Sequence, residues 1–211
     1  MSAPRSKYPR TPHLPWSPGA ATDDVKLDDC SKFEGRQVVV TEKMDGENTS
    51  LYSDGLHARS LDSRHHPSRD WVKAWHGGIA HHIPGGWRLC GENVYARHSI
   101  AYDHLESYFY LFSIWNEANH CLSWQETQEW AALLECPCPA VLFEGEWNAK
   151  TIRSLQIDPL TTEGYVVRLA DGFAWDNFSA SMGKWVRPHH VQTDQHWMHA
   201  PVIPNQLRNH G

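Results

Sequence analysis

The chain has 211 residues and a formal net charge of −6, and 40% of its residues are hydrophobic and 21% charged. These values are typical of a globular protein with one large domain or two small ones. They argue against a protein that simply coats nucleic acid, although they leave room for an enzyme with a local basic groove. No apolar run approaches the roughly 18 residues of a membrane span, and the N-terminus lacks the apolar core of a secretory signal. We therefore expect a cytoplasmic protein with no membrane partner.

The cysteines are odd in number, at positions Cys30, Cys90, Cys121, Cys136 and Cys138. An odd count without an export signal favours reduced thiols. The last two could form half of a metal site, but no second Cys/His pair lies at zinc-finger spacing.

Residues 1–35 hold many of the prolines and no periodic pattern, so we expect an N-terminal arm packed on the domain. Strand patterns begin at Gln37. The segments 37–43 and 47–52 flank Asp45–Gly46, the commonest two-residue hairpin signal, and predict a first β-hairpin. Residues 56–61 predict a third strand.

Two helices follow from periodicity and capping signals. Ser68 can cap a helix over 67–83, whose residues at i, i+4 and i+8 form an apolar face of Trp71, Trp75 and Ile79. Ser123 and Glu126 form a capping box that predicts a helix over 123–135.

The other segments predict mostly strands. Asp171–Gly172 lies within an alternating pattern over 163–178 and predicts a second hairpin. A short helix is expected at 148–157, and strands are expected at 87–95, 107–115, 140–147 and 182–188. Because hairpin-like connections dominate, the fold class is α+β with mainly antiparallel sheets flanked by helices, in a single domain over 36–211.

The segment Glu42–Asn48 reads EKMDGEN and contains a K-x-D-G motif. On its own this motif is weak, because a solvated lysine beside an ordinary turn has the same sequence. Further segments follow it in a fixed order: Ala58–Arg64, Gly91–Asn93, Phe109–Trp115, Glu163–Arg168 and Lys184–Arg187. Each has an ordinary structural explanation, such as a salt bridge, a core aromatic or an edge-strand lysine. Their joint occurrence in this order favours a reactive site.

The residue types suit attack of a lysine on phosphorus. Only the neutral amine is a nucleophile, and less than roughly one unperturbed lysine in a thousand is neutral at pH 7. We therefore expect burial or nearby positive charge to lower the pKa of Lys43. The candidate sources of that charge are Lys184, Arg187, Arg59 and a bound Mg²⁺. Carboxylates could hold a hard cation, and an aromatic ring could stack on a purine; the candidates are Glu92, Glu163 and Phe112.

These ordered motifs resemble those of the covalent nucleotidyltransferases, which include ATP-dependent RNA ligases, DNA ligases and capping enzymes. The sequence is most similar to the RNA ligase 2 family, whose first motif has the form E-K-x-[DH]-G-x-N. The resemblance covers nearly the whole chain. It implies an adenylyltransferase domain (ATP-grasp-like ligase fold), with ATP and Mg²⁺ or Mn²⁺ as cofactors.

The resemblance also implies a role for each matching residue. Lys43 would take AMP from ATP as a covalent lysyl-adenylate. The nucleotide would be held at adenine by the backbone of Glu42 and the ring of Phe112, at the ribose by Glu92, and at the α-phosphate by Lys184.

Three further roles concern the reacting ends. Asn48 would organise the acceptor end during sealing, and Arg59 would contact the ribose or the acceptor phosphate. Glu163 would bind the metal or orient Lys43.

The sequence departs from the family pattern at two places. Phe112 is followed by Ser113 where the phage enzymes have Asp. The last motif is usually K-x-K, whereas here Val186 stands at the second cation position, and Arg187 is a candidate replacement.

One stretch of the chain is clearly basic and predicts a phosphate-binding patch for nucleic acid, with a solvated helix start as the alternative. It contains Arg59, Arg64, His65, His66, Arg69 and Lys73. With Asn48 and Arg187, the residues Arg64 and Arg69 are the candidate nucleic-acid contacts.

We therefore expect an RNA ligase that joins 3′-hydroxyl and 5′-phosphate ends in RNA repair. The expected substrate is nicked duplex RNA or an RNA/DNA hybrid. We expect a monomer without an appended OB-fold, with a possible partner protein for substrate grip. The alternatives are a DNA ligase, a GTP-dependent capping-type enzyme, and a non-catalytic nucleic-acid-binding domain of the same fold.

Overall fold

The computed structural model describes residues 4–62, 65–188 and 201–208. Arg64 and the histidine-rich stretch 189–200 lie outside the described residues. No helix in the described ranges is long and apolar enough to cross a membrane.

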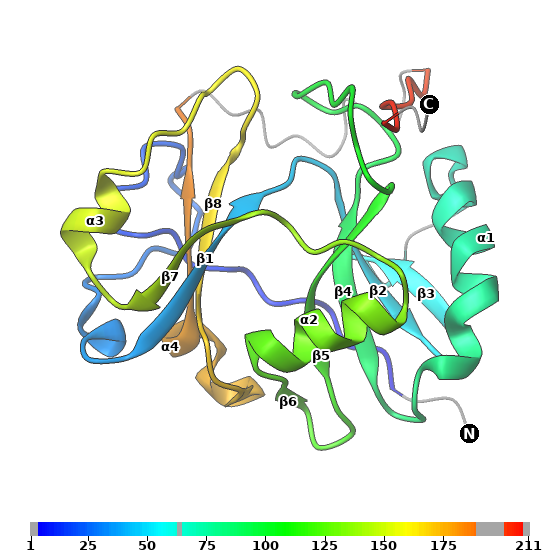
Figure 1. The fold of residues 1–211 in the computed structure, drawn as a ribbon, viewed down its shortest axis with the longest axis horizontal. Helices are drawn as coiled ribbons and strands as arrows, with labels where there is room; N and C mark the ends of the chain where they lie inside the picture. The colour runs from blue at the N-terminus through cyan, green and yellow to red at the C-terminus, as the bar shows by residue number, and fades with distance from the viewer. Residues whose placement is uncertain (1–3, 63–64, 189–200, 209–211) are drawn as a thin grey trace.

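Two antiparallel sheets stand side by side and form the centre of the molecule (Figure 1). Sheet A has the strand order β10 (Met182–Val186), β8 (Gly164–Leu169), β1 (Gln37–Lys43) and β7 (Val141–Glu146). Sheet B has the order β3 (Gly55–Ala58), β2 (Glu47–Tyr52), β4 (Arg88–Asn93), β5 (Phe109–Trp115), β6 (His120–Cys121) and β9 (Phe173–Ala174). The expected α+β class with mainly antiparallel sheets is confirmed.

Helices flank both sheets, with α1 outside sheet B and α3 outside sheet A (Figure 1). The α-helices are α1 (Asp70–Ile79), α2 (Trp124–Leu133), α3 (Ala149–Arg153) and α4 (Phe178–Ser181). Short 3₁₀ turns are η1 (Ser31–Phe33), η2 (Pro67–Arg69), η3 (Ala80–His82) and η4 (Trp175–Asn177).

The capping box of α2 is confirmed. The backbone N–H of Glu126 donates to Ser123 Oγ at 3.2 Å, and the N–H of Ser123 donates back to Glu126 Oε2 at 2.9 Å. This reciprocal pair satisfies two backbone donors that a helix start otherwise leaves free.

The expected cap of α1 is wrong. Ser68 lies inside η2, which His66 caps by accepting from the backbone N–H of Ser68. Helix α1 itself has Arg69 at its N-cap, without a side-chain cap bond. The expected apolar face is confirmed, since Trp71, Trp75 and Ile79 pack against the core cluster of sheet B.

Both expected hairpins are wrong, and for the same reason. Strand β1 pairs with β7 and β8, whereas β2 pairs with β3 and β4. Strand β8 also belongs to sheet A, whereas β9 pairs with β6 of sheet B. Each Asp–Gly pair therefore carries the chain from one sheet to the other instead of turning it back on itself.

The first crossing requires glycine at position 46. A Cβ placed there would lie 2.5 Å from the backbone oxygen of Asn93 and 2.9 Å from Val94 Cγ1. The crossing segment thus passes close to the end of β4 in sheet B, and a side chain at position 46 would force the backbone apart.

We predict that Gly46→Ala lowers the free energy of unfolding by about 1–3 kcal/mol, because the new methyl overpacks against backbone. The matched control is Gly77→Ala in α1, where an added Cβ meets nothing within 4 Å. That change should raise stability by about 0.5–1 kcal/mol through helix propensity. Urea unfolding of both variants measures the difference, and equal effects at the two positions would contradict the prediction.

Candidate active site

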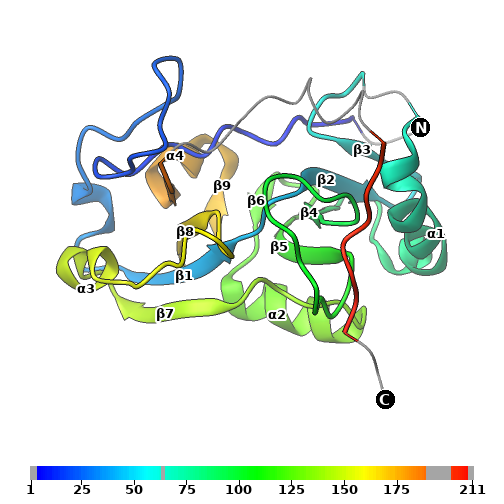
Figure 2. The same cartoon turned by 90° about the horizontal axis from the view of Figure 1, so that it is seen from above.

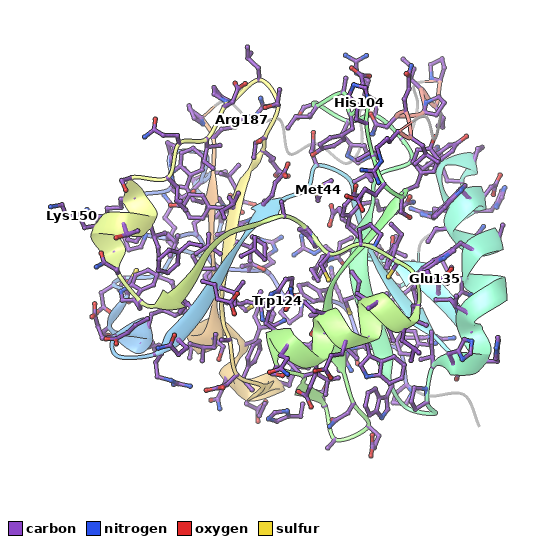
Figure 3. All side chains as sticks on the ribbon, in the orientation of Figure 1. Met44, His104, Trp124, Glu135, Lys150 and Arg187 are labelled. Atoms are coloured by element: carbon purple, nitrogen blue, oxygen red, sulfur yellow. The ribbon has the colours of Figure 1, made fainter. Side chains whose placement is uncertain are left out.

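A cavity of about 1210 Å³ lies between the two sheets, with lining residues from both. Figure 3 places Met44 and Trp124 at this junction, where the chain leaves β1 and where α2 begins. The cavity gathers most of the site residues expected from the sequence: Glu42, Lys43, Asn48, Arg59, Arg69, Glu92, Phe112, Glu163 and Lys184.

Lys43 is the last residue of β1 and faces a carboxylate from the neighbouring strand end. Its Nζ lies 2.7 Å from Glu163 Oε2, and the side chains are 24% and 4% exposed. Register explains the contact, because Lys43 is paired with Gly164, the residue that follows Glu163 and begins β8. The sheet therefore fixes the amine before any ligand binds.

The protein groups alone do not lower the pKa of Lys43, and the expected contribution of bound Mg²⁺ stays a prediction. Burial lowers the pKa of this amine, but the carboxylates of Glu163, Glu92 and Asp45 outweigh burial and raise the pKa above its usual value. Lys43 is thus a protonated lysine at neutral pH when no ligand occupies the cavity.

Lys184 on β10 shows the opposite shift. Burial and the charge of Lys43 lower the pKa of Lys184 to about 8, against the opposing effects of Asp24 and Glu163. The pKa values of the two lysines are therefore shifted in opposite directions because their neighbours differ.

Glu92 on β4 is a carboxyl group of the same cavity. Burial raises the pKa of Glu92 to about 8, and the charges of Glu163 and Asp45 add to burial, whereas Lys43 opposes it. One oxygen accepts the backbone N–H of Gly46 at 3.2 Å. In register, Glu92 stands opposite Asn48 of β2.

Asp45 anchors the crossing beside Lys43, a role that the sequence interpretation missed. Its Oδ2 accepts from the backbone N–H groups of Ser99 and Ile100, both at 2.8 Å, and from the Ser99 hydroxyl at 2.6 Å. Its own backbone N–H donates to the Tyr102 hydroxyl at 2.9 Å. The K-x-D-G pattern identified this residue, but its partners could not be read from the sequence.

The apolar part of the cavity surrounds Phe112 on β5. The lining residues of this part are Tyr8, Phe112, Trp124, Val166 and Met182. Arg168 holds the Phe112 backbone, since its Nη1 donates to the Phe112 carbonyl at 3.2 Å. Tyr8 and Arg168 were not expected in the site, and the arm that carries Tyr8 has no periodic signal that could have revealed it.

The side chains of Asn48 and Arg69 both line the cavity but differ in their hydrogen bonding. Asn48 Oδ1 is buried and has no hydrogen-bond partner among the described residues. Arg69, by contrast, is 5% exposed and forms an ion pair with Glu47, with Nε 2.6 Å from Oε2. Its guanidinium is therefore turned into the protein, not presented on an exposed basic patch.

The remaining basic residues are divided between the cavity and its surroundings. Arg59, His65 and His66 line the cavity. Arg187 is absent from the lining residues that the structure describes. Its guanidinium donates to the Pro159 carbonyl and, at 3.1 Å, to Ser99 Oγ. Ser99 itself lines the cavity, so Arg187 lies beside the cavity edge, and its replacement of the cation missing at the buried Val186 stays a prediction.

A divalent cation fits the chemistry of the cavity. Glu92 and Glu163 offer hard oxygen ligands close to Lys43. Burial raises the pKa of Glu92, and the negative charges of Glu163 and Asp45 add to it, so a cation bound here would be favoured. No group of three or more His, Cys, Asp or Glu in the described residues could hold a metal ion. Two carboxylates suit Mg²⁺, which usually keeps several waters and takes further oxygens from substrate phosphates.

The raised pKa of Glu92 predicts how stability depends on pH. Between about pH 4.5 and 8 the folded state keeps a proton that the unfolded chain releases, so stability falls as pH rises through this window. Glu92→Gln should remove this fall and raise the free energy of unfolding at pH 8 by at least about 1 kcal/mol. Denaturant unfolding at pH 5 and pH 8, in buffer that contains a chelator, measures the free energy of unfolding of both proteins.

The control for this prediction is Glu144→Gln on β7, where the side chain is exposed. That variant should keep the pH dependence of the wild-type protein. A fall in stability that persists in Glu92→Gln would assign the pH dependence to another group.

Three solved structures share this fold. The Naegleria gruberi RNA ligase with pyrophosphate has a TM-score of 0.56 and 20% identity, over 87% of this chain and 61% of that one. A mutant of the same ligase with ATP and manganese has a TM-score of 0.54 and 19% identity, over 74% of this chain and 51% of that one. An archaeal ATP-dependent RNA ligase has a TM-score of 0.57 and 16% identity, over 85% of this chain and 48% of that one. The chain thus spans about half to three fifths of the length of these proteins.

No curated protein matches the chain. A family model described as RNA ligase matches residues 36–186. This span begins just before β1 and ends with β10, so it contains both sheets and Lys43, Glu92, Glu163 and Lys184 of the cavity. The chain belongs to the RNA ligase family.

Proposed function

We propose that this chain is the catalytic domain of an ATP-dependent RNA ligase of the RNA ligase 2 type. It would join 3′-hydroxyl and 5′-phosphate ends through AMP carried on Lys43. The observation that supports this most directly is the position of the Lys43 amine, 2.7 Å from Glu163 in a cavity lined by both sheets.

The reaction begins with attack of Lys43 Nζ on the α-phosphorus of ATP. A bond forms between nitrogen and phosphorus, the bond to the β-phosphate oxygen breaks, and pyrophosphate leaves. Before the attack the ammonium group of Lys43 must release a proton to solvent, and Glu163 Oε2, which accepts its hydrogen bond, would orient it. Lys184 faces the same cavity and is suited to neutralising the α-phosphate. Glu92 and Glu163 would hold Mg²⁺ or Mn²⁺, which when bound would supply positive charge to the phosphate oxygens.

The nucleotide would lie with its base at the apolar end of the cavity. The half-buried ring of Phe112 offers a stacking face. The backbone of Glu42 would contact adenine, Glu92 would contact the ribose, and Arg59 would contact the ribose or the acceptor phosphate.

In the later steps AMP passes to the 5′-phosphate of one strand, and the 3′-hydroxyl of another displaces it. We assign Asn48 to this acceptor end. Its Oδ1 is a buried acceptor without a partner in the described residues, which suits a hydroxyl donor.

The RNA substrate is proposed to be a nick in duplex RNA or in an RNA/DNA hybrid, met in RNA repair. Arg64, Arg69 and Arg187 remain candidate nucleic-acid contacts, although Arg69 would first have to leave Glu47. A net charge of −6 suits weak intrinsic RNA affinity, hence activity that falls with salt or needs a partner protein. The chain is proposed to act as a monomer in the cytoplasm, in keeping with its five free cysteines.

We predict that incubation with α-labelled ATP and Mg²⁺ or Mn²⁺ labels the protein covalently. Lys43→Ala should abolish the label, since it removes the nucleophile, and chelator should abolish it as well. The control Lys150→Ala should keep it, because Lys150 lies on α3 on the outer side of sheet A (Figure 3). A denaturing gel measures the label. Label from GTP alone would indicate a capping-type enzyme, and no label with either nucleotide would contradict an active nucleotidyltransferase.

We predict that Asn48→Ala spares the lysyl-adenylate but slows sealing of a pre-adenylated nick by at least about tenfold, the effect of one lost hydrogen bond in a buried site. Single-turnover sealing of RNA and DNA nicks measures this and also shows which strand must be RNA. Sealing at the wild-type rate would remove Asn48 from the acceptor site.

A further inference from the structure

We propose that Tyr8 of the N-terminal arm is a positioning residue of the base subsite. It would hold the Phe112 ring in place and so set the affinity for the nucleotide base. The inference rests on the proposed function, which places the nucleotide base on Phe112. Tyr8 lies outside the span 36–186 that matches the family model.

The arm is built into the fold on both sides of Tyr8. Before it, the backbone N–H of Ser6 donates to the Tyr52 hydroxyl of β2 at 3.0 Å, and the Arg5 guanidinium lies 4.2 Å above the Tyr52 ring. Arg5 also forms a 2.9 Å ion pair with Asp54, between β2 and β3. These contacts fasten one end of the arm to sheet B.

After Tyr8 the arm joins sheet A. The backbone N–H of Lys184 donates to the Pro12 carbonyl at 2.9 Å, and the N–H of Leu14 donates to the Lys184 carbonyl at 2.8 Å. Figures 1 and 2 show the blue arm crossing from the sheet A side of the molecule to β3. The segment around Tyr8 therefore bridges the two sheets that form the cavity walls.

Within this segment the side chain of Tyr8 points inward and packs against Phe112, the proposed stacking surface for the base. Its side chain is 7% exposed, and its ring meets Phe112 edge to face, with centroids 5.4 Å apart at 76°. It meets Phe178 of α4 in the same way, at 5.5 Å and 89°. Tyr8 also lines the cavity itself.

Arg168 and Tyr8 contact different parts of Phe112. Arg168 bonds the carbonyl of Phe112 and so fixes its backbone. Tyr8 contacts the ring, whose orientation the backbone bond does not determine. An edge-to-face pair of this kind restrains the ring that would stack on a purine.

The test measures ATP binding by calorimetry without divalent cations, where no adenylate forms. Tyr8→Leu should weaken binding about two- to tenfold, the range expected for one aromatic pair. Tyr8→Phe keeps the ring and should bind as the wild type does. The matched control is Phe33→Leu, a 1% exposed aromatic of the same core cluster that does not line the cavity; it should leave ATP binding unchanged.

Two further readouts separate positioning from general loss of structure. In Tyr8→Leu the half-saturating ATP concentration for protein labelling should rise, while the maximal labelling rate stays within about twofold of wild type. Inhibition by inorganic tripolyphosphate, which lacks a base, should not change. Unchanged ATP binding in Tyr8→Leu, an equal loss in Phe33→Leu, or an equal loss of tripolyphosphate affinity would overturn the inference. Wild-type protein that binds ATP but forms no adenylate would overturn only the proposed function.

Discussion

The buried carboxylate of Asp45 fixes the point at which the chain passes from one sheet to the other. It is 4% exposed and accepts three hydrogen bonds from Ser99 and Ile100. On one side of it Lys43 ends β1 in sheet A, and on the other side Asn48 lies in β2 of sheet B. The proposed nucleophile Lys43 and the proposed acceptor-end residue Asn48 are thus a few residues apart in sequence yet belong to the two different sheets that line one cavity.

The cavity contains both carboxylates and lysines, which suits a ligand that carries positive as well as negative charge. Three carboxylates raise the pKa of Lys43, whereas Lys184 lies among cations and a buried environment that lower its pKa. Glu92 keeps a proton that an exposed carboxylate would release, mainly because burial disfavours its charged form. A nucleotide would bring negative charge to the lysines, and a divalent cation would bring positive charge to the carboxylates. The site is therefore suited to binding the two as a unit.

The sequence predicted elements with local signals and missed those that depend on distant partners. The capping box at Ser123 predicts α2 without any distant partner. The order of the motifs along the chain grouped most of the residues that line the cavity into one predicted site. Alternation around Asp45–Gly46 indicated two strands, but it carries no information on which strands pair, and the partners of β1 begin about a hundred residues later. Likewise, the basic stretch could not show that Glu47 would pair with Arg69, and nothing local marked Tyr8 as part of the site.

The pairing of the arm with β10 also has a consequence for how the protein folds during synthesis. Pro12 and Leu14 hydrogen-bond to Lys184, so the arm can pair with β10 only after β10 has left the ribosome. Contacts between such distant segments form slowly. The cavity, which Lys184 helps to line, therefore cannot assemble before β10 is made, and a chain that stopped before β10 would lack this wall.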